Sequence, residues 1–175
     1  MCVSELCKGW PVYRDASEWN HYRHLFAKEG AFVFTTWSGG LPIDDIIYTS
    51  IKGRANGDFI MHRETGTLVD LNPATQRAVG KMKATITQRF SWDDGVDFDV
   101  ECNCRFINFC LKEGASPGYQ YLAVAQSRLG HPILADLPTM DDQAFLDLYA
   151  AMDAWLLGRP VGDLLGIPKE AVPRY

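Results

Sequence analysis

The sequence has no long hydrophobic run, no excess of basic residues and no ordered set of cysteines. None of its apolar stretches approaches the roughly 20 residues that a membrane-spanning helix needs. The net charge of −5 disfavours a nucleic-acid partner, because binding to phosphate requires a basic surface. The five cysteines are odd in number and lack metal-ligand spacing; Cys102 and Cys104, for example, lie only two apart. We therefore expect reduced thiols, no metal site, no nucleic-acid partner and no membrane span.

Familiar nucleotide and hydrolase motifs are missing as well. The glycine-containing segment 37–41 lacks the lysine and the spacing of a phosphate-binding loop, and no serine-hydrolase elbow is present. Residues 1–9 lack the basic start, apolar centre and small-residue cleavage site of a secretion signal. These absences favour cofactor-free chemistry and a cytoplasmic location.

The composition is that of one ordinary globular domain. The chain has 175 residues, of which 47% are apolar and 22% charged. That length is enough to bury a sizeable core, and no internal repeat or linker divides it. We expect residues 1–175 to form a single domain.

The first third of the chain has mixed periodicity. Asp15 or Ser17 is expected to cap a helix in which Trp19, Tyr22 and Phe26 share one apolar face. Aromatic and β-branched residues predict a strand over residues 31–37. A second helix is predicted over residues 43–52.

From His62 onwards the period changes to two, which indicates strands. Strands are predicted over residues 67–71, 75–91 and 97–112, the last two joined by an Asp94-Gly95 turn. The two longest runs exceed the usual strand length and must bend, with Gly80 as a bending point.

Helices are predicted again towards the C-terminus. Residues 119–129 can be a helix or an atypical strand, and we favour the helix because Pro117 suits a first helical turn. Residues 141–157 have the clearest helical stripe, with Gly158 as its stop. The chain should therefore be an α+β roll.

Four short motifs occur in this order of elements. They are Asp15 before the first predicted helix, the His62 segment 61–67, the strand end 87–90 and the strand segment 103–105. Together they resemble the NTF2-like superfamily, and within it the scytalone dehydratase and SnoaL-like polyketide cyclase group, over about residues 10–114. The resemblance implies a cone-shaped roll, in which a curved antiparallel sheet holds helices in its concave face. Residues 115–175 would then be a C-terminal helical extension.

The same resemblance implies catalytic residues. His62 falls where these dehydratases place a pocket histidine that handles the proton, and Asp15 falls near the carboxylate that orients it. Thr87 stands where they carry a second catalytic histidine, and Phe34 where they carry a tyrosine, and we expect both to contact the substrate. These departures leave dehydration by that machinery open to question, while isomerisation and cyclisation remain open.

Other side chains are expected to bind substrate. Strand alternation puts Asn103 and Arg105 on one face with Glu101, and we expect this polar face to line the pocket rather than to be a solvated outer face. Tyr48 is either a second hydrogen-bond donor or a core residue with its hydroxyl at the rim. Trp37 is expected to lie at the pocket. Three histidines are expected at the surface: His21, His24 and His131.

Two functions follow as expectations. The first is a cofactor-independent lyase or isomerase, dehydratase- or cyclase-like, acting on a cyclic polyketide- or terpenoid-derived ketone or enol in secondary metabolism. The second is a non-catalytic module that binds a small molecule or mediates oligomerisation. In either case the resemblance implies a homodimer or homotrimer.

Overall fold

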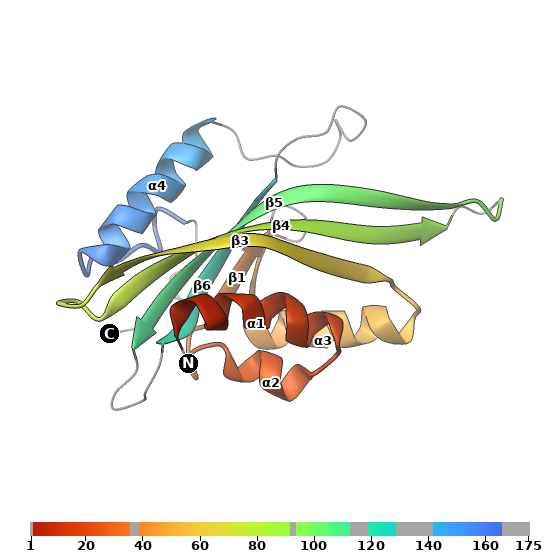
Figure 1. The fold of residues 1–175 in the computed structure, drawn as a ribbon, viewed down its shortest axis with the longest axis horizontal. Coiled ribbons are helices and arrows are strands. Elements are labelled where there is room, and N and C mark those ends of the chain that lie inside the picture. Colours follow the sequence, from red (N-terminus) through yellow and green to blue (C-terminus); the bar gives the residue numbers. More distant parts are fainter. Residues whose placement is uncertain (1, 36–38, 92–93, 113–118, 129–141, 166–175) are drawn as a thin grey trace.

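The computed structural model describes residues 2–35, 39–91, 94–112, 119–128 and 142–165. Within them, six strands form one strongly curved sheet with helices on both faces (Figure 1). Three helices lie against one face and the last helix lies against the other. The α+β class with a curved sheet agrees with the prediction, and so does the additional C-terminal helix. No helix of the described part combines the length and the apolar character that crossing a bilayer requires.

The first part of the chain supplies three helices and two short strands. In chain order these are α1 (Val3–Asp15), α2 (Trp19–His24), β1 (Phe32–Thr35), β2 (Gly39–Pro42) and α3 (Ile43–Ala55). The structure confirms the three elements predicted here, although α2 is shorter than expected and α3 is longer. Helix α1 was not predicted. It precedes the helix that was expected to open the fold.

The rest of the chain is mainly strand. The elements are β3 (Ile60–Asn72), β4 (Arg77–Ser91), β5 (Asp97–Lys112), β6 (Tyr119–Arg128) and α4 (Asp142–Leu156). The long strands predicted over residues 75–91 and 97–112 are confirmed, the second with the bounds expected. Helix α4 agrees with its prediction within one residue at each end, and Gly158, at a φ of +79°, follows it as a left-handed stop.

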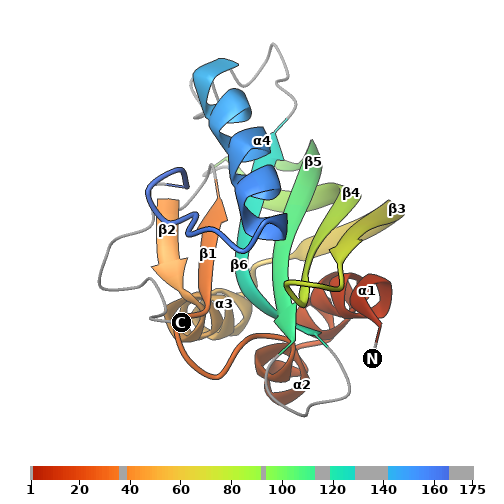
Figure 2. The ribbon, with the colours of Figure 1, turned by 90° about the vertical axis from the view of Figure 1, so that its left-hand side faces the viewer.

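The strand order in the sheet is β2-β1-β6-β5-β4-β3 (Figure 2). Neighbours pair antiparallel, except for β1 and β6, which pair parallel. The long strands β3, β4 and β5 extend beyond the rest of the sheet as a curved arm (Figure 1). Because β3 comes last in the strand order, it is an edge strand, and among the described residues its outer side has no partner strand.

The helix predicted over residues 119–129 is wrong, because Tyr119–Arg128 forms strand β6. The extension after residue 114 is therefore not wholly helical. Strand β6 lies between β5 and β1 and pairs with both. Without it, β1 and β5 would each lack a partner strand on one side, and this requirement outweighs the local preference of the segment. Pro117, on which the helical prediction rested, lies outside the described residues.

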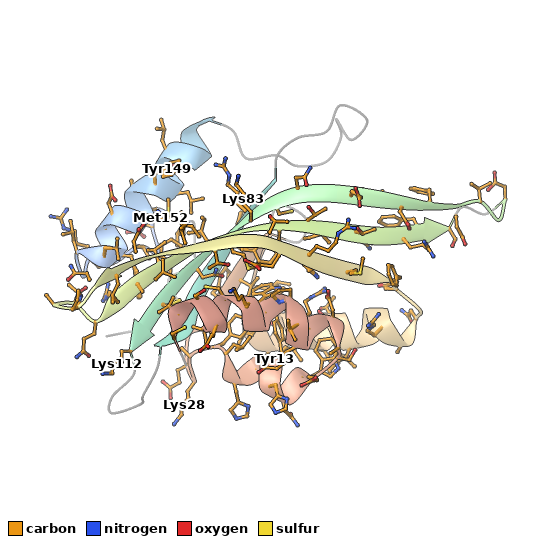
Figure 3. The ribbon with its side chains drawn as sticks, in the orientation of Figure 1. Tyr13, Lys28, Lys83, Lys112, Tyr149 and Met152 are labelled. Carbon is orange, nitrogen blue, oxygen red and sulfur yellow. The ribbon has the colours of Figure 1, made fainter. Side chains whose placement is uncertain are left out.

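Two hydrophobic cores lie on opposite faces of the sheet. The larger core packs α1, α2 and α3 against the concave face, with Trp10, Tyr22, Phe26 and Phe106 among its buried side chains. The smaller core packs α4 against the other face. Figure 3 shows Met152 directed from α4 towards the sheet and Tyr149 directed away from it. Three helices, α1, α2 and α3, thus cover the concave face of the sheet.

Gly80 allows α1 to lie close to the sheet. A Cβ atom at this position would stand 2.4 Å from the Cys7 sulfur, inside the van der Waals limit. The glycine in the middle of β4 is therefore required by the close approach of the helix. Its role as a bending point stays a prediction.

Candidate active site

The C-terminal end of α1 sets the position of Asp15. Ser17 has a left-handed backbone with a φ of 60°, its amide donates to the Arg14 carbonyl at 3.1 Å, and the Glu18 amide donates to the Tyr13 carbonyl at 2.8 Å. This is the hydrogen-bond pattern that ends a helix. The prediction that Asp15 or Ser17 caps the following helix is therefore wrong; both belong to the end of α1, and Asp15 is its last residue.

His62 meets Asp15 across the edge of the sheet. The backbone amide of His62 donates to Asp15 Oδ2 at 2.6 Å, and the ring Nδ1 lies 2.8 Å from Asp15 Oδ1. One carboxylate thus satisfies an amide of the edge strand and also holds the imidazole ring. The His62 side chain is 5% exposed and that of Asp15 is 20% exposed. Asp15 and His62 are therefore brought together as expected.

The contact between Asp15 and His62 Nδ1 determines which ring nitrogen carries the hydrogen when the carboxyl group is ionised and the imidazole is neutral. An ionised carboxylate only accepts hydrogen bonds, so Nδ1 carries the hydrogen and Nε2 presents a lone pair. Burial is the largest influence on the ring and lowers the pKa of His62 below 6.5. The hydrogen bond to Asp15 acts in the opposite direction, and the positive charge of Arg14 lowers the pKa further. The ring is therefore neutral near pH 7 and is able to act as a base.

His62 faces a cavity of about 350 Å³, within the range of small-molecule sites. Most of the wall is apolar and comes from the helices and the concave face of the sheet. The apolar lining comprises Trp10, Trp19, Val33, Leu41, Ile46, Ile60, Ile86 and Val100. Polar residues also line the cavity, and they lie on α1, on α3 and its following turn, and on β3 and β4. They are Arg14, Asp15, Thr49, Ser50, Arg54, Asp58, His62 and Gln88.

Asn103 and Arg105 do not line this cavity, so the face assigned to them is wrong. Lys83 pairs with Arg105 in the sheet, and Figure 3 shows the Lys83 side chain on the side away from α1. On the concave side β5 presents Cys102 and Cys104, both 3% exposed. The alternation itself was correct. The prediction exchanged the two faces of β5, because the polar residues were expected to line the pocket and the cysteines therefore fell on the other face.

Thr87 also belongs to the outer face, where it accepts a hydrogen bond from Arg63 at 2.9 Å. Arg63 forms an ion pair there with Glu101. Phe34 packs against Gly40 and does not line the cavity, whereas its neighbour Val33 does. The polar side chains of Thr87, Arg63 and Glu101 do not line the cavity that His62 faces.

Tyr48 is 59% exposed, with the Lys52 ammonium 4.4 Å from the centre of its ring. It is neither a donor in the cavity nor a core residue, so both expectations for it are wrong. Trp37 and His131 lie outside the described residues. His21 and His24 are exposed on α2, as predicted.

Arg14 and Arg54 are the cationic residues of the cavity that sequence reasoning missed. A signal for Arg14 was present, because it follows Trp10 by one helical turn, but it is visible only if residues 3–15 are recognised as a helix. Arg54 donates to the Asp15 carbonyl at 2.6 Å and thereby joins α3 to the end of α1. Among the described residues, no three His, Cys, Asp or Glu side chains stand close enough to hold a metal ion.

Comparison with solved structures shows the same fold. A candidate scytalone dehydratase from Novosphingobium aromaticivorans superposes with a TM-score of 0.62 at 10% identity, covering 80% of this chain and 91% of that one. A hexachlorocyclohexane dehydrochlorinase from Novosphingobium barchaimii superposes with a TM-score of 0.59 at 8% identity, covering 79% and 92%. At these identities the similarity concerns the fold alone.

Sequence comparison finds nearer relatives in fungi. A PEP2-like protein of Fusarium vanettenii is 51% identical over 118 residues. The alignment covers 67% of this chain, and this chain spans only 50% of the length of that relative. Pea pathogenicity protein 2 of the same fungus is 36% identical over 202 aligned positions, which cover 91% of this chain and 86% of that protein. The model of the SnoaL-like domain matches residues 1–113. The chain therefore belongs to the SnoaL-like family.

Proposed function

We propose that the protein is a cofactor-independent lyase or isomerase in which His62 is the general acid and base. The observation that carries the proposal is the contact between Asp15 and His62 Nδ1, at 2.8 Å, in a ring that lines an apolar cavity. A carboxylate behind a buried imidazole fixes the tautomer and stabilises the imidazolium that forms when the ring accepts a proton.

The proposed chemistry begins at a carbon next to a carbonyl group. His62 Nε2 takes the proton, and the electron pair of the broken C–H bond moves through the new C=C bond to the carbonyl oxygen. Return of the proton to another carbon gives an isomer, whereas departure of a leaving group gives an elimination product. Asp15 remains ionised throughout and holds the ring in place.

The size and lining of the cavity favour a cyclic and largely apolar substrate. Two tryptophans, Trp10 and Trp19, line the cavity, and a volume of about 350 Å³ admits a molecule of a few rings. We propose a polyketide- or terpenoid-derived ketone or enol of secondary metabolism. Two structural neighbours are named for a dehydratase and a dehydrochlorinase, and both names denote eliminations.

Hydrogen–deuterium exchange on cyclic ketones tests the proposal without knowledge of the natural substrate. In D₂O, loss of the α-proton signals of a panel of tetralones and cyclohexenones is followed by NMR with and without protein. We expect the parent protein to accelerate exchange on at least one ketone. His62→Gln should lose about 10²–10⁴-fold of this acceleration, and Asp15→Asn should lose much of it because the ring is no longer held in the correct tautomer.

His24→Gln is the matched control, because it makes the same change on an exposed histidine of α2. It should exchange protons at the parental rate. Equal rates for His62→Gln and the parent would contradict the proposal, and so would a panel on which the parent protein has no effect. A panel on which the parent has no effect would favour the rival function, a non-catalytic module that binds a small molecule, whereas equal acceleration by His62→Gln would assign the base to another residue.

A further inference from the structure

Arg14 occupies a position that the pattern of α1 reserves for an apolar side chain. The helix buries Val3, Leu6, Cys7 and Trp10 against the sheet, and Arg14 is the next position on this stripe. Its side chain is only 18% exposed. An arginine so placed loses hydration, and in a well-packed core it would be unfavourable unless its charge were compensated.

The compensation within the described residues is weak. Arg14 Nη1 lies 3.8 Å from Asp15 Oδ1, at the outer limit of an ion pair, and no hydrogen bond from its guanidinium to another described residue is formed. Asp15 gives its short contacts to His62 instead, one from each oxygen. Arg54, the other arginine of the cavity, is already committed to the Asp15 carbonyl and to Ser17 Oγ at 3.3 Å. Arg14 is thus a guanidinium with available donors in the wall of the cavity.

We propose that Arg14 binds an ionised ring oxygen of the ligand, as found in an enolate or a phenolate, while the apolar body of the ligand lies against Trp10 and Trp19. The proposal rests on the proposed function, because the proton transfer to His62 leaves negative charge on the carbonyl oxygen. The charge balance is complete: the proton ends on Nε2, the electron pair ends on the oxygen, and the guanidinium faces the new anion. Fixed donors at a developing negative charge contribute strongly in a dry site.

The same charge favours the basic form of His62. Arg14 is one of the groups that lower the pKa of His62, together with burial, whereas Asp15 raises it. Arg14 therefore opposes formation of the imidazolium when no anion is bound. Once an anionic oxygen neutralises the guanidinium, that opposition weakens, and the proton is accepted more readily at the moment when the enolate forms.

Binding of 4-nitrophenol tests the proposal, because its ionised form mimics an enolate and absorbs visible light. The pKa of the bound probe is read from its absorbance, and affinity from quenching of the tryptophan fluorescence. We expect the parent protein to lower the pKa of the bound probe and to prefer nitrophenolate over the uncharged 4-nitroanisole. Arg14→Gln should weaken nitrophenolate binding at least about tenfold while changing nitroanisole binding less than about twofold.

Two further variants make the outcome unambiguous. Arg63→Gln removes an arginine from the outer face and should bind both probes as the parent does. Arg14→Lys keeps the charge and should retain part of the preference, even if the packing of α1 changes. Equal nitrophenolate affinities for Arg14→Gln and the parent would overturn the proposal, as would a parent protein with no preference for the anion.

The two hypotheses fail separately. His62→Gln should abolish the deuterium exchange of ketones but keep the preference for nitrophenolate, because Arg14 remains. If the parent protein exchanges ketone protons through His62 but does not prefer nitrophenolate over nitroanisole, only the role of Arg14 is overturned. If the parent protein prefers nitrophenolate but does not accelerate the deuterium exchange of any ketone, the acid–base function is overturned instead.

Discussion

At the scale of single residues, Asp15 connects stability with chemistry. It accepts one hydrogen bond from the backbone of β3 and faces the ring nitrogen of the same residue. The backbone contact positions the edge strand, and the ring contact decides which nitrogen of His62 carries the proton. A residue that served only one of these purposes would need one carboxylate oxygen, whereas Asp15 uses both.

The lowered pKa of His62 predicts how stability depends on pH. Because burial holds the folded pKa below 6.5, the unfolded chain binds more protons between that value and the folded pKa. The contribution to stability is complete above pH 6.5 and is lost as the pH falls towards the folded pKa. The free energy of unfolding, measured with urea at several pH values, should therefore fall less steeply with acid in His62→Gln than in the parent. Identical slopes would contradict this account.

The residues of the site differed in how far the sequence could predict them. Asp15 and His62 were found because their neighbourhood resembles a known family. Asn103 and Arg105 were misplaced, because alternation defines two faces of a strand but does not say which one is inside. The inner face of β5 is occupied by thiols, which behave as small apolar groups when buried. Arg14 was missed because it depends on a helix that was not predicted.

At the scale of elements, local preference and tertiary packing disagreed twice. Helix α1 contains Gly9 and Pro11, two weak helix formers, yet its apolar stripe packs against the sheet. Strand β6 follows a segment that favoured a helical start, yet both its neighbours need a partner strand. In both cases, packing and backbone pairing outweigh propensity, and neither is visible in a short window of sequence.

The close contact of α1 with β4 gives a prediction for this element. Gly80→Ala would place a methyl group 2.4 Å from the Cys7 sulfur, and Asn108 stands 3.5 Å away on the same side. The helix must therefore move away from the sheet, at a cost of about 1–3 kcal/mol in the free energy of unfolding. Urea denaturation measures the loss.

A second change tests the cause. In the background Cys7→Ala, the sulfur is absent and the added methyl group has room. Gly80→Ala should then cost clearly less than it does in the parent, as a double-mutant cycle would show. Equal costs in the two backgrounds would mean that the backbone freedom of glycine, and not the contact with Cys7, explains this residue.

At the scale of the whole molecule, the sheet separates two different surroundings. Its concave face holds the cavity beneath α1 and α3, and its other face is covered in part by α4. The uncovered part of that face carries paired charges, including the ion pair of Arg63 and Glu101 and that of Lys81 and Asp70. Self-association as a homodimer or homotrimer stays a prediction.

The whole fold also explains why the cavity can be apolar and still contain a working base. The curved sheet supplies apolar side chains from β1, β2, β3, β4 and β5, while the end of one helix brings Asp15 and Arg14 to the rim of the sheet. The charged side chains of Asp15 and Arg14 thus lie beside the edge strand β3, where the backbone amide of His62 needs a hydrogen-bond acceptor. This arrangement buries an imidazole at the wall of the cavity while its Nδ1 contacts Asp15.

The most direct test of the central claim is a ¹⁵N NMR titration of the His62 ring in the labelled protein, assigned by comparison with His62→Gln. We predict a neutral ring with its hydrogen on Nδ1 near pH 7, and a pKa below 6.5 that rises in Arg14→Gln. A ring protonated on Nε2, or one that is already charged at pH 7, would contradict the account.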